Sequence, residues 1–171
     1  AENGLPGDFR VLLMGLSEEL RALDERIAAF DARIAQVARE DDRIKRLLEI
    51  EGIGPITASA LVAAVGDATQ FNSGRDMAAC FGLTPRQHSS GGKNRLGRIS
   101  KRGDKYIRML LVHGARAALN AAKHKEDGRS RWIMNLADRR NKNIATVALA
   151  NKNARIAWSI LSRGESYRKA A

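Results

Sequence analysis

A run of apolar residues spaced alternately four and three positions apart occupies the first part of the chain. It begins at Phe9, ends at Leu48 and is interrupted only at Asp41. An apolar period of 3.5 residues held over five heptads is typical of a left-handed coiled coil, whereas a surface helix of a globular domain uses a wider and shorter stripe. The series comprises Phe9, Leu13, Leu16, Leu20, Leu23, Ile27, Phe30, Ile34, Val37, Ile44 and Leu48.

This pattern predicts a coiled-coil arm over about residues 9–48, so that residues 1–48 form a dimerisation domain. We expect self-association through this arm, as a dimer or a higher assembly. The alternative is an antiparallel helical hairpin that packs on its own domain. Neither Gly nor Pro interrupts residues 16–51, and this continuity disfavours a hairpin.

Electric charge divides the chain into two unlike parts. Residues 1–50 carry 8 Lys/Arg against 11 Asp/Glu, whereas residues 51–171 carry 22 against 8. A strongly basic surface attracts nucleic acid, so we expect the second part to bind it. A membrane is not expected as a partner, because the cations lie in a glycine-rich segment and no stretch approaches the ~18 apolar residues of a membrane span.

Helical periodicity continues through residues 49–171, and no strand is predicted there. We predict helices over about residues 74–81, 104–122, 129–140 and 143–163. The last is apolar on most sides and is expected at the centre of the fold. Its polar insert, Asn151-Lys152-Asn153, must either reach nucleic acid or be satisfied internally. The predicted fold class is all-α, with a long coiled-coil arm followed by a helical domain over residues 49–171.

The segment from Leu47 to Asp67 resembles a helix-hairpin-helix module. A helix ends at Gly52, a Gly-Ile-Gly turn follows, and Pro55 opens the next helix, where its missing N–H costs nothing. In such modules two glycines let the backbone approach a DNA phosphate, which the N–H groups at the helix start bind. The resemblance implies nucleic-acid contacts at Gly52 and Gly54. The alternative is a tight helix–helix corner without a ligand.

Residues 84–105 form a glycine-rich, basic segment in which two hydroxyls, Ser89 and Ser90, precede Gly91 and Gly92. Backbone N–H groups and cationic side chains in such a segment suit a polyanion. A serine there could also attack a phosphodiester while the cations offset charge on the phosphorane. The alternative is a phosphate-binding loop without chemistry. The predicted nucleic-acid-binding residues of this region are Arg86, His88, Ser89, Gly91, Gly92, Lys93, Arg95, Arg98, Lys101, Arg102, Lys105 and Arg108.

Metal chemistry is not predicted within this chain. The residues His88, His113, His124 and Cys80 lack the spacing of zinc ligands, and carboxylates after residue 51 are too sparse for catalytic Mg²⁺. Adjacency to the two serines is weak support for His88 as a general base, so we expect this histidine to face DNA. Cys80, the only cysteine, is expected to be a small buried hydrophobe.

Five motifs occur in a fixed order along the second part of the chain. They are Gly-Ile-Gly-Pro (52–55), Phe-Gly-Leu-Thr-Pro (81–85), Ser-Ser-Gly-Gly-Lys (89–93), Gly-Arg-Ile-Ser-Lys-Arg-Gly (97–103) and Ile-Arg-Met-Leu-Leu-Val-His-Gly-Ala-Arg (107–116). This ordered series resembles the carboxy-terminal half of the DEDD-type insertion-sequence transposases of the family numbered one hundred and ten, which are related to the Piv DNA invertases. The resemblance covers about residues 45–163, and the preceding arm is similar to the coiled coil that joins the family's two catalytic domains.

The resemblance implies an RNA-guided DNA transposase or recombinase. Family members have a RuvC-like domain with an acidic tetrad, a carboxy-terminal domain with a catalytic serine, and a structured bridge RNA that pairs with donor and target DNA. The family serine directly precedes the glycine of its Ser-Gly pair, which places it at Ser90, with Ser89 as its neighbour. Its attack on a DNA phosphodiester would give a covalent phosphoserine intermediate. The implied setting is the bacterial cytoplasm, at the nucleoid.

No acidic tetrad is present in this sequence, so we expect it to be part of a longer chain. No cofactor is then expected within this chain, and Mg²⁺ is expected in the missing RuvC-like domain. Alone, the fragment is expected to bind nucleic acid but to recombine poorly or not at all. The alternative from another class is a non-enzymatic, dimeric helix-hairpin-helix module that binds nucleic acid. A third, less favoured alternative is a structural protein that associates with RNA.

Overall fold

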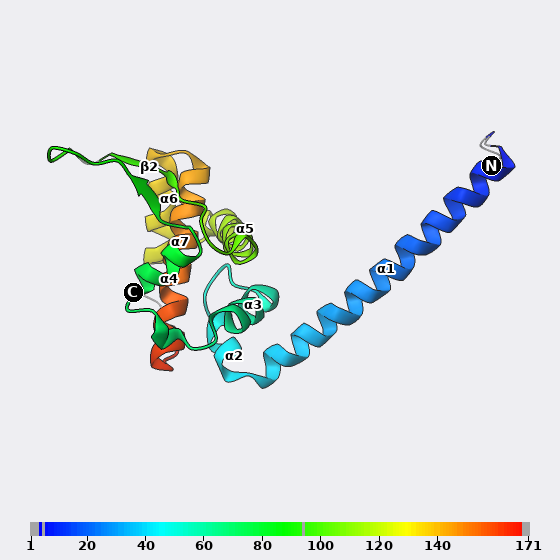
Figure 1. Cartoon of the computed structure of the whole chain (residues 1–171), viewed down its shortest axis with the longest axis horizontal. Helices are drawn as coiled ribbons and strands as arrows, with labels where there is room; N and C mark the ends of the chain where they lie inside the picture. Colours follow the sequence, from blue (N-terminus) through cyan, green and yellow to red (C-terminus); the bar gives the residue numbers. More distant parts are fainter. Residues whose placement is uncertain (1–3, 5, 94, 169–171) are drawn as a thin grey trace.

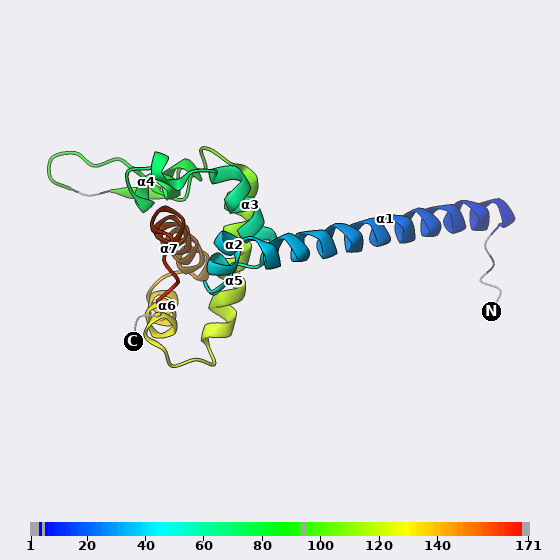
Figure 2. The same cartoon turned by 90° about the horizontal axis from the view of Figure 1, so that it is seen from below.

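The computed structural model describes residues 4, 6–93 and 95–168, and it shows a helical domain from which two arms project (Figures 1 and 2). The outermost residues of the two expected domains, 1–3, 5 and 169–171, lie outside the described part. The predicted all-α class is confirmed, with one small hairpin added. The described elements are α1 (Gly7–Glu40), α2 (Asp42–Leu48), α3 (Pro55–Val65), η1 (Ala68–Gln70), α4 (Gly74–Cys80), β1 (Pro85–Gln87), β2 (Leu96–Ile99), α5 (Lys105–Ala122), α6 (Gly128–Arg139) and α7 (Lys142–Arg163).

The first arm is α1, one continuous helix of 34 residues, which is about 51 Å long. It meets the domain only near its carboxy-terminal end, at α2 and α3 (Figures 1 and 2). Most of its heptad residues are exposed to solvent: Leu20 is 63% exposed, Ile27 57% and Phe30 65%. A single extended helix is incompatible with the hairpin alternative. Pairing of the helix with a second chain stays a prediction.

The helix breaks at Asp41, so the arm does not continue to residue 48 as the heptad predicts. The backbone of Asp41 is extended (φ −91°, ψ 115°), and its carboxylate accepts a 2.8 Å hydrogen bond from the backbone N–H of Arg43 at the start of α2. Aspartate is favoured at this capping position because it satisfies an N–H that has no partner within the helix. Beyond the break, Ile44 is only 2% exposed and belongs to the domain core.

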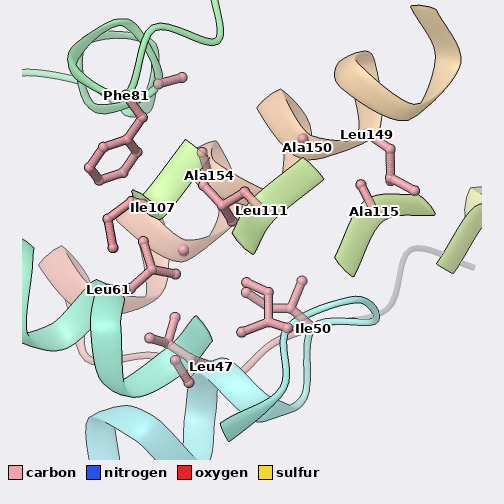
Figure 3. Packing of buried hydrophobic residues seen from close by; sticks show 14 of the residues in the cluster. Leu47, Ile50, Leu61, Phe81, Ile107, Leu111, Ala115, Leu149, Ala150 and Ala154 are labelled. Carbon is pink, nitrogen blue, oxygen red and sulfur yellow. The ribbon is translucent and has the colours of Figure 1, made fainter. Parts of the chain in front are cut away.

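The core forms around α7, against which α2, α4, α5 and α6 pack. Figure 3 shows Leu47 of α2, Leu61 of α3 and Leu111 of α5 in one cluster with Ala150 and Ala154 of α7. Because alanine side chains are small, neighbouring helices can pack close to α7, as expected for a densely packed interior. The predicted central position of this helix is confirmed.

The two asparagines of the α7 polar insert, Asn151 and Asn153, are satisfied internally. The side chain of Asn153 is fully buried, accepts a 2.6 Å hydrogen bond from the guanidinium of Arg129 and donates one of 3.0 Å to the carbonyl of Glu51. Arg129 donates to the same Glu51 carbonyl at 2.9 Å. Asn151 donates to the carbonyl of Leu83 at 3.2 Å. This network joins α7 to the α2–α3 turn and to the start of the basic segment.

The short helix α4 begins where its capping box predicts. The hydroxyl of Ser73 accepts from the backbone N–H of Asp76 and lies 3.0 Å from the Asp76 carboxylate. Met77 and Ala78 face the core and are buried. The expectation that Cys80 is buried is wrong, because it is exposed: a helix of seven residues on the surface buries only one face.

Candidate nucleic-acid interface

The basic segment folds as a β-hairpin, which projects from the domain as its second arm (Figures 1 and 2). Strands β1 and β2 are antiparallel, with Pro85 opposite Ile99 and Gln87 opposite Leu96. The expectation that the segment contains no strand is wrong. Both strands are short and almost wholly exposed, so they lack the apolar alternation by which a strand is recognised. The glycine pair between two short runs was the available signal.

The tip of the hairpin is a tight turn made by the glycine pair. Gly91 and Gly92 have φ values of 56° and 76°, a pair of positive angles typical of a type I′ turn. The backbone N–H of Lys93 donates to the carbonyl of Ser90 at 3.1 Å and closes the turn. Ser90 therefore lies at the end of the arm, where it is exposed.

The two adjacent serines have different surroundings. The hydroxyl of Ser89 accepts hydrogen bonds from Nε2 of Gln87 at 3.0 Å and from the backbone N–H of Arg95 at 3.1 Å. The Ser90 hydroxyl has no hydrogen-bond partner among the residues that the structure describes. Ser89 thus stabilises the hairpin, while the Ser90 hydroxyl remains available to a ligand.

Close backbone packing fixes the root of the hairpin. Gly82 and Gly103 have φ values of 68° and 80°, and a Cβ on Gly82 would overlap the backbone of Arg102. The guanidinium of Arg108, from α5, donates to the carbonyls of Phe81 at 3.0 Å and Arg102 at 3.2 Å. Arg108 was predicted to bind nucleic acid, but these bonds give it an internal role in holding the arm to the domain.

Seven of the predicted cations lie on the hairpin, at its root or at the start of α5, and all are exposed. None of them forms an ion pair with a carboxylate in the described part of the chain. Their charge is therefore available to an external anion. His88 lies on the same arm, exposed, and its backbone N–H donates to the carbonyl of Arg95 at 2.9 Å. The seven cations are Arg86, Lys93, Arg95, Arg98, Lys101, Arg102 and Lys105.

The nucleic-acid contacts predicted at Gly52 and Gly54 lie in the α2–α3 turn and not on the hairpin that carries the seven cations. Gly52 (φ 87°) packs on α5, where a Cβ would lie 2.6 Å from the carbonyl oxygen of Gly114. Gly114 is nine residues beyond Lys105, or about 14 Å along the helix axis. Gly54 is exposed and precedes α3 without a side-chain cap. Gly52 thus has a packing role, while nucleic-acid contacts at Gly52 and at Gly54 stay predictions.

Three cations outside the predicted set also gather. Arg75 of α4 lies with Lys152 and Arg155 of α7 along one cleft. Arg75 and Lys152 are far apart in the sequence, and no motif links them. The sequence offered two signals here: the polar insert that contains Lys152, and the spacing of Lys152 and Arg155, which places them on one helix face.

Within the described ranges, no group of three or more His, Cys, Asp or Glu could hold a metal ion. None of the helices described has both the length and the apolar character needed to cross a bilayer.

Residues 44–131 match the model of the Transposase IS116/IS110/IS902 family. The chain is 56% identical over 164 residues to a protein of Pseudomonas aeruginosa named "Probable family 20 transposase", covering 96% of this chain and 48% of that protein. It is 46% identical over 165 residues to the transposase for insertion sequence element IS1111A of Coxiella burnetii, covering 96% and 45% respectively. For the transposase of element IS1328 of Yersinia enterocolitica, the identity is 39% over 168 residues, covering 98% and 50%.

The chain spans about half the length of the curated relatives it matches. The family model covers more than half of the chain, from α2 through α5 and into α6, and this region includes the whole basic hairpin. The chain therefore belongs to the Transposase IS116/IS110/IS902 family.

Proposed function

We propose that this chain is the DNA-binding, catalytic-serine part of a longer DNA transposase or recombinase, guided by a structured RNA. The observation that carries the proposal is the hairpin. Within the described residues, the Ser90 hydroxyl at its tip has no hydrogen-bond partner, and seven cations on or beside the arm form no ion pair. The names of the relatives support the class of reaction. Action on bacterial DNA would place the protein at the nucleoid, in the cytoplasm.

In the proposed reaction, Oγ of Ser90 attacks the phosphorus of a DNA phosphodiester. A new P–O bond to serine forms as the hydroxyl loses its proton, and the bond to one sugar oxygen breaks with its electron pair. The departing sugar oxygen takes up a proton and becomes a hydroxyl, so that protons and charge balance. The phosphoserine ester keeps the energy of the original ester for rejoining. Lys93 and Arg95 lie close to Ser90 in the hairpin and would offset the charge that develops on the phosphorane.

The metal that the resemblance implies does not fit this part of the protein. The described residues offer no group of three or more His, Cys, Asp or Glu that could hold Mg²⁺. We assign the acidic tetrad and its Mg²⁺ to a RuvC-like domain elsewhere in the longer chain. A fragment without that domain is expected to bind nucleic acid but not to complete recombination.

We also propose that α1 self-associates through its heptad face. Leu20, Leu23 and Ile27 are each more than 40% exposed on a helix that touches the domain only at one end. Such a stripe is stabilised when a second apolar stripe covers it.

The experiment that tests the serine assignment is Ser90→Ala in the full-length enzyme, with its guide RNA and labelled donor DNA. Covalent DNA–protein adducts are counted on a denaturing gel. We expect Ser90→Ala to reduce adducts to background, because alanine has no nucleophile, and Ser89→Ala to retain most of them. Adducts that persist undiminished in Ser90→Ala would show that another residue is the nucleophile, with Ser89 the next to test.

A second candidate function is nucleic-acid binding without chemistry. It is favoured by one observation: no residue in the described ranges hydrogen-bonds to the Ser90 hydroxyl and could take its proton. Both functions predict binding to duplex DNA with log K falling by about 0.9 per neutralised phosphate for each tenfold rise in salt. Salt dependence alone therefore does not distinguish them, whereas adduct formation does.

A further inference from the structure

A cleft of about 840 Å³ lies between α4, α6 and α7, outside every predicted site. Its walls carry three cations, Arg75, Lys152 and Arg155, and two indoles, Trp132 and Trp158. The start of α4 packs tightly on α7 here, since a Cβ on the neighbouring Gly74 would lie 2.9 Å from the carbonyl oxygen of Arg155. This close approach brings cations from two distant segments to one place. We call it the α4–α7 cleft.

The positive charge of the cleft is not neutralised. No carboxylate in the described part of the chain forms an ion pair with Arg75, Lys152 or Arg155. Burial lowers the pKa of the Lys152 ammonium, and the positive charges of Arg129 and Arg155 lower it further. Neighbouring positive charges repel one another, and an anion bound between them offsets this repulsion. The three cations of the cleft are therefore suited to bind an anion.

The aromatic walls are held in place. The Lys152 ammonium lies 4.1 Å from the centre of the Trp132 ring, a cation–π contact. The indole N–H of Trp158 donates to the carbonyls of Ala68 at 3.1 Å and Phe71 at 3.2 Å. Fixed aromatic rings beside cations are the combination by which proteins hold single-stranded nucleic acid, with bases on the rings and phosphates on the cations.

The cleft adjoins the root of the hairpin. Asn151, in the cleft wall, donates to the carbonyl of Leu83, two residues before β1. In Figure 1, α4, α6, α7 and the hairpin all lie on the side of the molecule away from α1. A strand bound along the hairpin could therefore continue into the cleft. The volume is that of a small-ligand site, which suits one or two nucleotides and not a duplex.

We propose that the α4–α7 cleft binds a single-stranded stretch of nucleic acid, with Arg75, Lys152 and Arg155 on its phosphates and Trp132 beside a base. The proposal takes nucleic acid as the partner from the proposed function, but it requires neither the hairpin nor the chemistry of Ser90. DNA and RNA both offer the phosphodiester that this cleft would bind, and the experiment below distinguishes the two sources of the strand.

The test uses the full-length enzyme carrying Arg75→Glu and Arg155→Glu. Both side chains are exposed, and an acid in the first turn of a helix is well tolerated, so we expect the melting temperature to stay close to that of the parent protein. The probes are fluorescein-labelled 12-nucleotide oligo-dT and oligo-rU and a 20-base-pair DNA duplex, with binding followed by anisotropy. We expect single-strand affinity to fall about tenfold or more and duplex affinity to change less than about twofold. A preference for oligo-dT or oligo-rU identifies the source of the strand.

Two matched variants control the result. Arg116→Glu with Lys123→Glu, the α5 variant, makes the same change of charge at two exposed residues, one in α5 and one directly after its end. It should leave single-strand affinity within about twofold of the parent. Lys93→Gln with Arg95→Gln, on the hairpin, should weaken duplex binding and leave single-strand binding less affected. The proposal is overturned if the cleft variant binds both single strands as tightly as the parent, or loses no more affinity than the α5 variant. If only the hairpin variant lost duplex binding, the hairpin would still be supported as a duplex-binding site, whatever the result for the cleft. The proposal for the hairpin and the proposal for the cleft can therefore fail separately.

Discussion

Two glycines allow the α2–α3 turn and α5 to cross with their backbones in contact. Gly52 has φ 87°, and a Cβ there would lie 2.6 Å from the carbonyl oxygen of Gly114. A Cβ on Gly114 would in turn overlap the carbonyl of Gly52. Gly54, two residues later, has φ −96° and open space around it. Of the three, Gly52 and Gly114 therefore require glycine at this crossing, whereas Gly54 does not.

Gly52→Ala is expected to lower the free energy of unfolding by about 1–3 kcal/mol, because it combines an unfavourable positive φ with a clash against Gly114. Gly54→Ala should change it by less than about 1 kcal/mol. Urea denaturation of the two variants gives the comparison. If Gly52→Ala kept the parent midpoint but bound DNA more weakly, Gly52 would be a DNA contact and not a packing residue.

At the scale of elements, Asp41 decides where the arm ends and the domain begins. Its carboxylate lies 2.7 Å from the guanidinium of Arg43, and this hydrogen bond is the largest cause that lowers the pKa of Asp41 from 3.8 to about 2. The Arg43 side chain is 50% exposed, so solvent screens the pair and its contribution to stability is small.

A carboxylate whose pKa is lower in the folded state stabilises the fold above its unfolded pKa, and this contribution is lost as the pH falls through the folded pKa. For Asp41 the window runs from about pH 4 to about pH 2. Asp41→Asn keeps the cap but removes the charge, so we expect it to be less stable than the parent by under about 1 kcal/mol at pH 7. The difference in urea midpoint between Asp41→Asn and the parent should become small near pH 2, where the Asp41 carboxylate becomes protonated.

Arg43→Gln is the matched control, since it removes the partner of Asp41 and should reproduce the same dependence on pH. A gap between Asp41→Asn and the parent that stayed constant from pH 7 to pH 2 would show that the ion pair contributes nothing.

At the scale of the whole molecule, the charges beside the heptad face of α1 bear on how two copies would pair. In a parallel coiled coil, Glu19 would lie beside Asp24 of the second copy, a repulsive pair, and Arg26 beside Asp31, an attractive one. In the antiparallel register that fully overlaps the seam, Glu19 would lie beside Arg26, and no like charges would meet. Charge therefore favours the antiparallel pairing, which places the two domains at opposite ends of the arm.

We expect disulfide crosslinking to detect this orientation in chains that carry Cys80→Ser and one new cysteine. Leu13→Cys mixed with Phe30→Cys should give a mixed disulfide dimer, because these positions share a layer in the antiparallel register. Each variant alone should crosslink poorly, whereas a parallel coil would crosslink each with itself. Mass spectrometry of the dimers separates the two outcomes.

A variant with Leu20→Ser, Leu23→Ser and Ile27→Ser provides the control for self-association and should be monomeric. A solution mass unchanged by these three substitutions would show that α1 is not the dimer interface.

Local patterns in the sequence predicted much of this structure. The long helix, the cap at Ser73, and the extents of α4, α5 and α7 follow from residues within a few positions of each other. The order of motifs around Gly52 and Ser90 indicated the family that the comparison then established. The sequence did not predict the hairpin, because neither of its strands buries an apolar face that would show as alternation. It did not predict the end of the arm at Asp41, because the heptad spacing of apolar residues resumes at Ile44.

By itself, the sequence determined the helices, the distribution of charge and the family, since helix periodicity, capping and turn formation are short-range interactions that each segment carries with it. Only the tertiary structure decided that Gly52 packs on Gly114, that Arg108 holds the root of the hairpin, and that Arg129 and Asn153 share the carbonyl of Glu51. The same holds for the α4–α7 cleft. These contacts join residues far apart in the chain, and they arise because burying the apolar faces of several helices together fixes which distant segments meet.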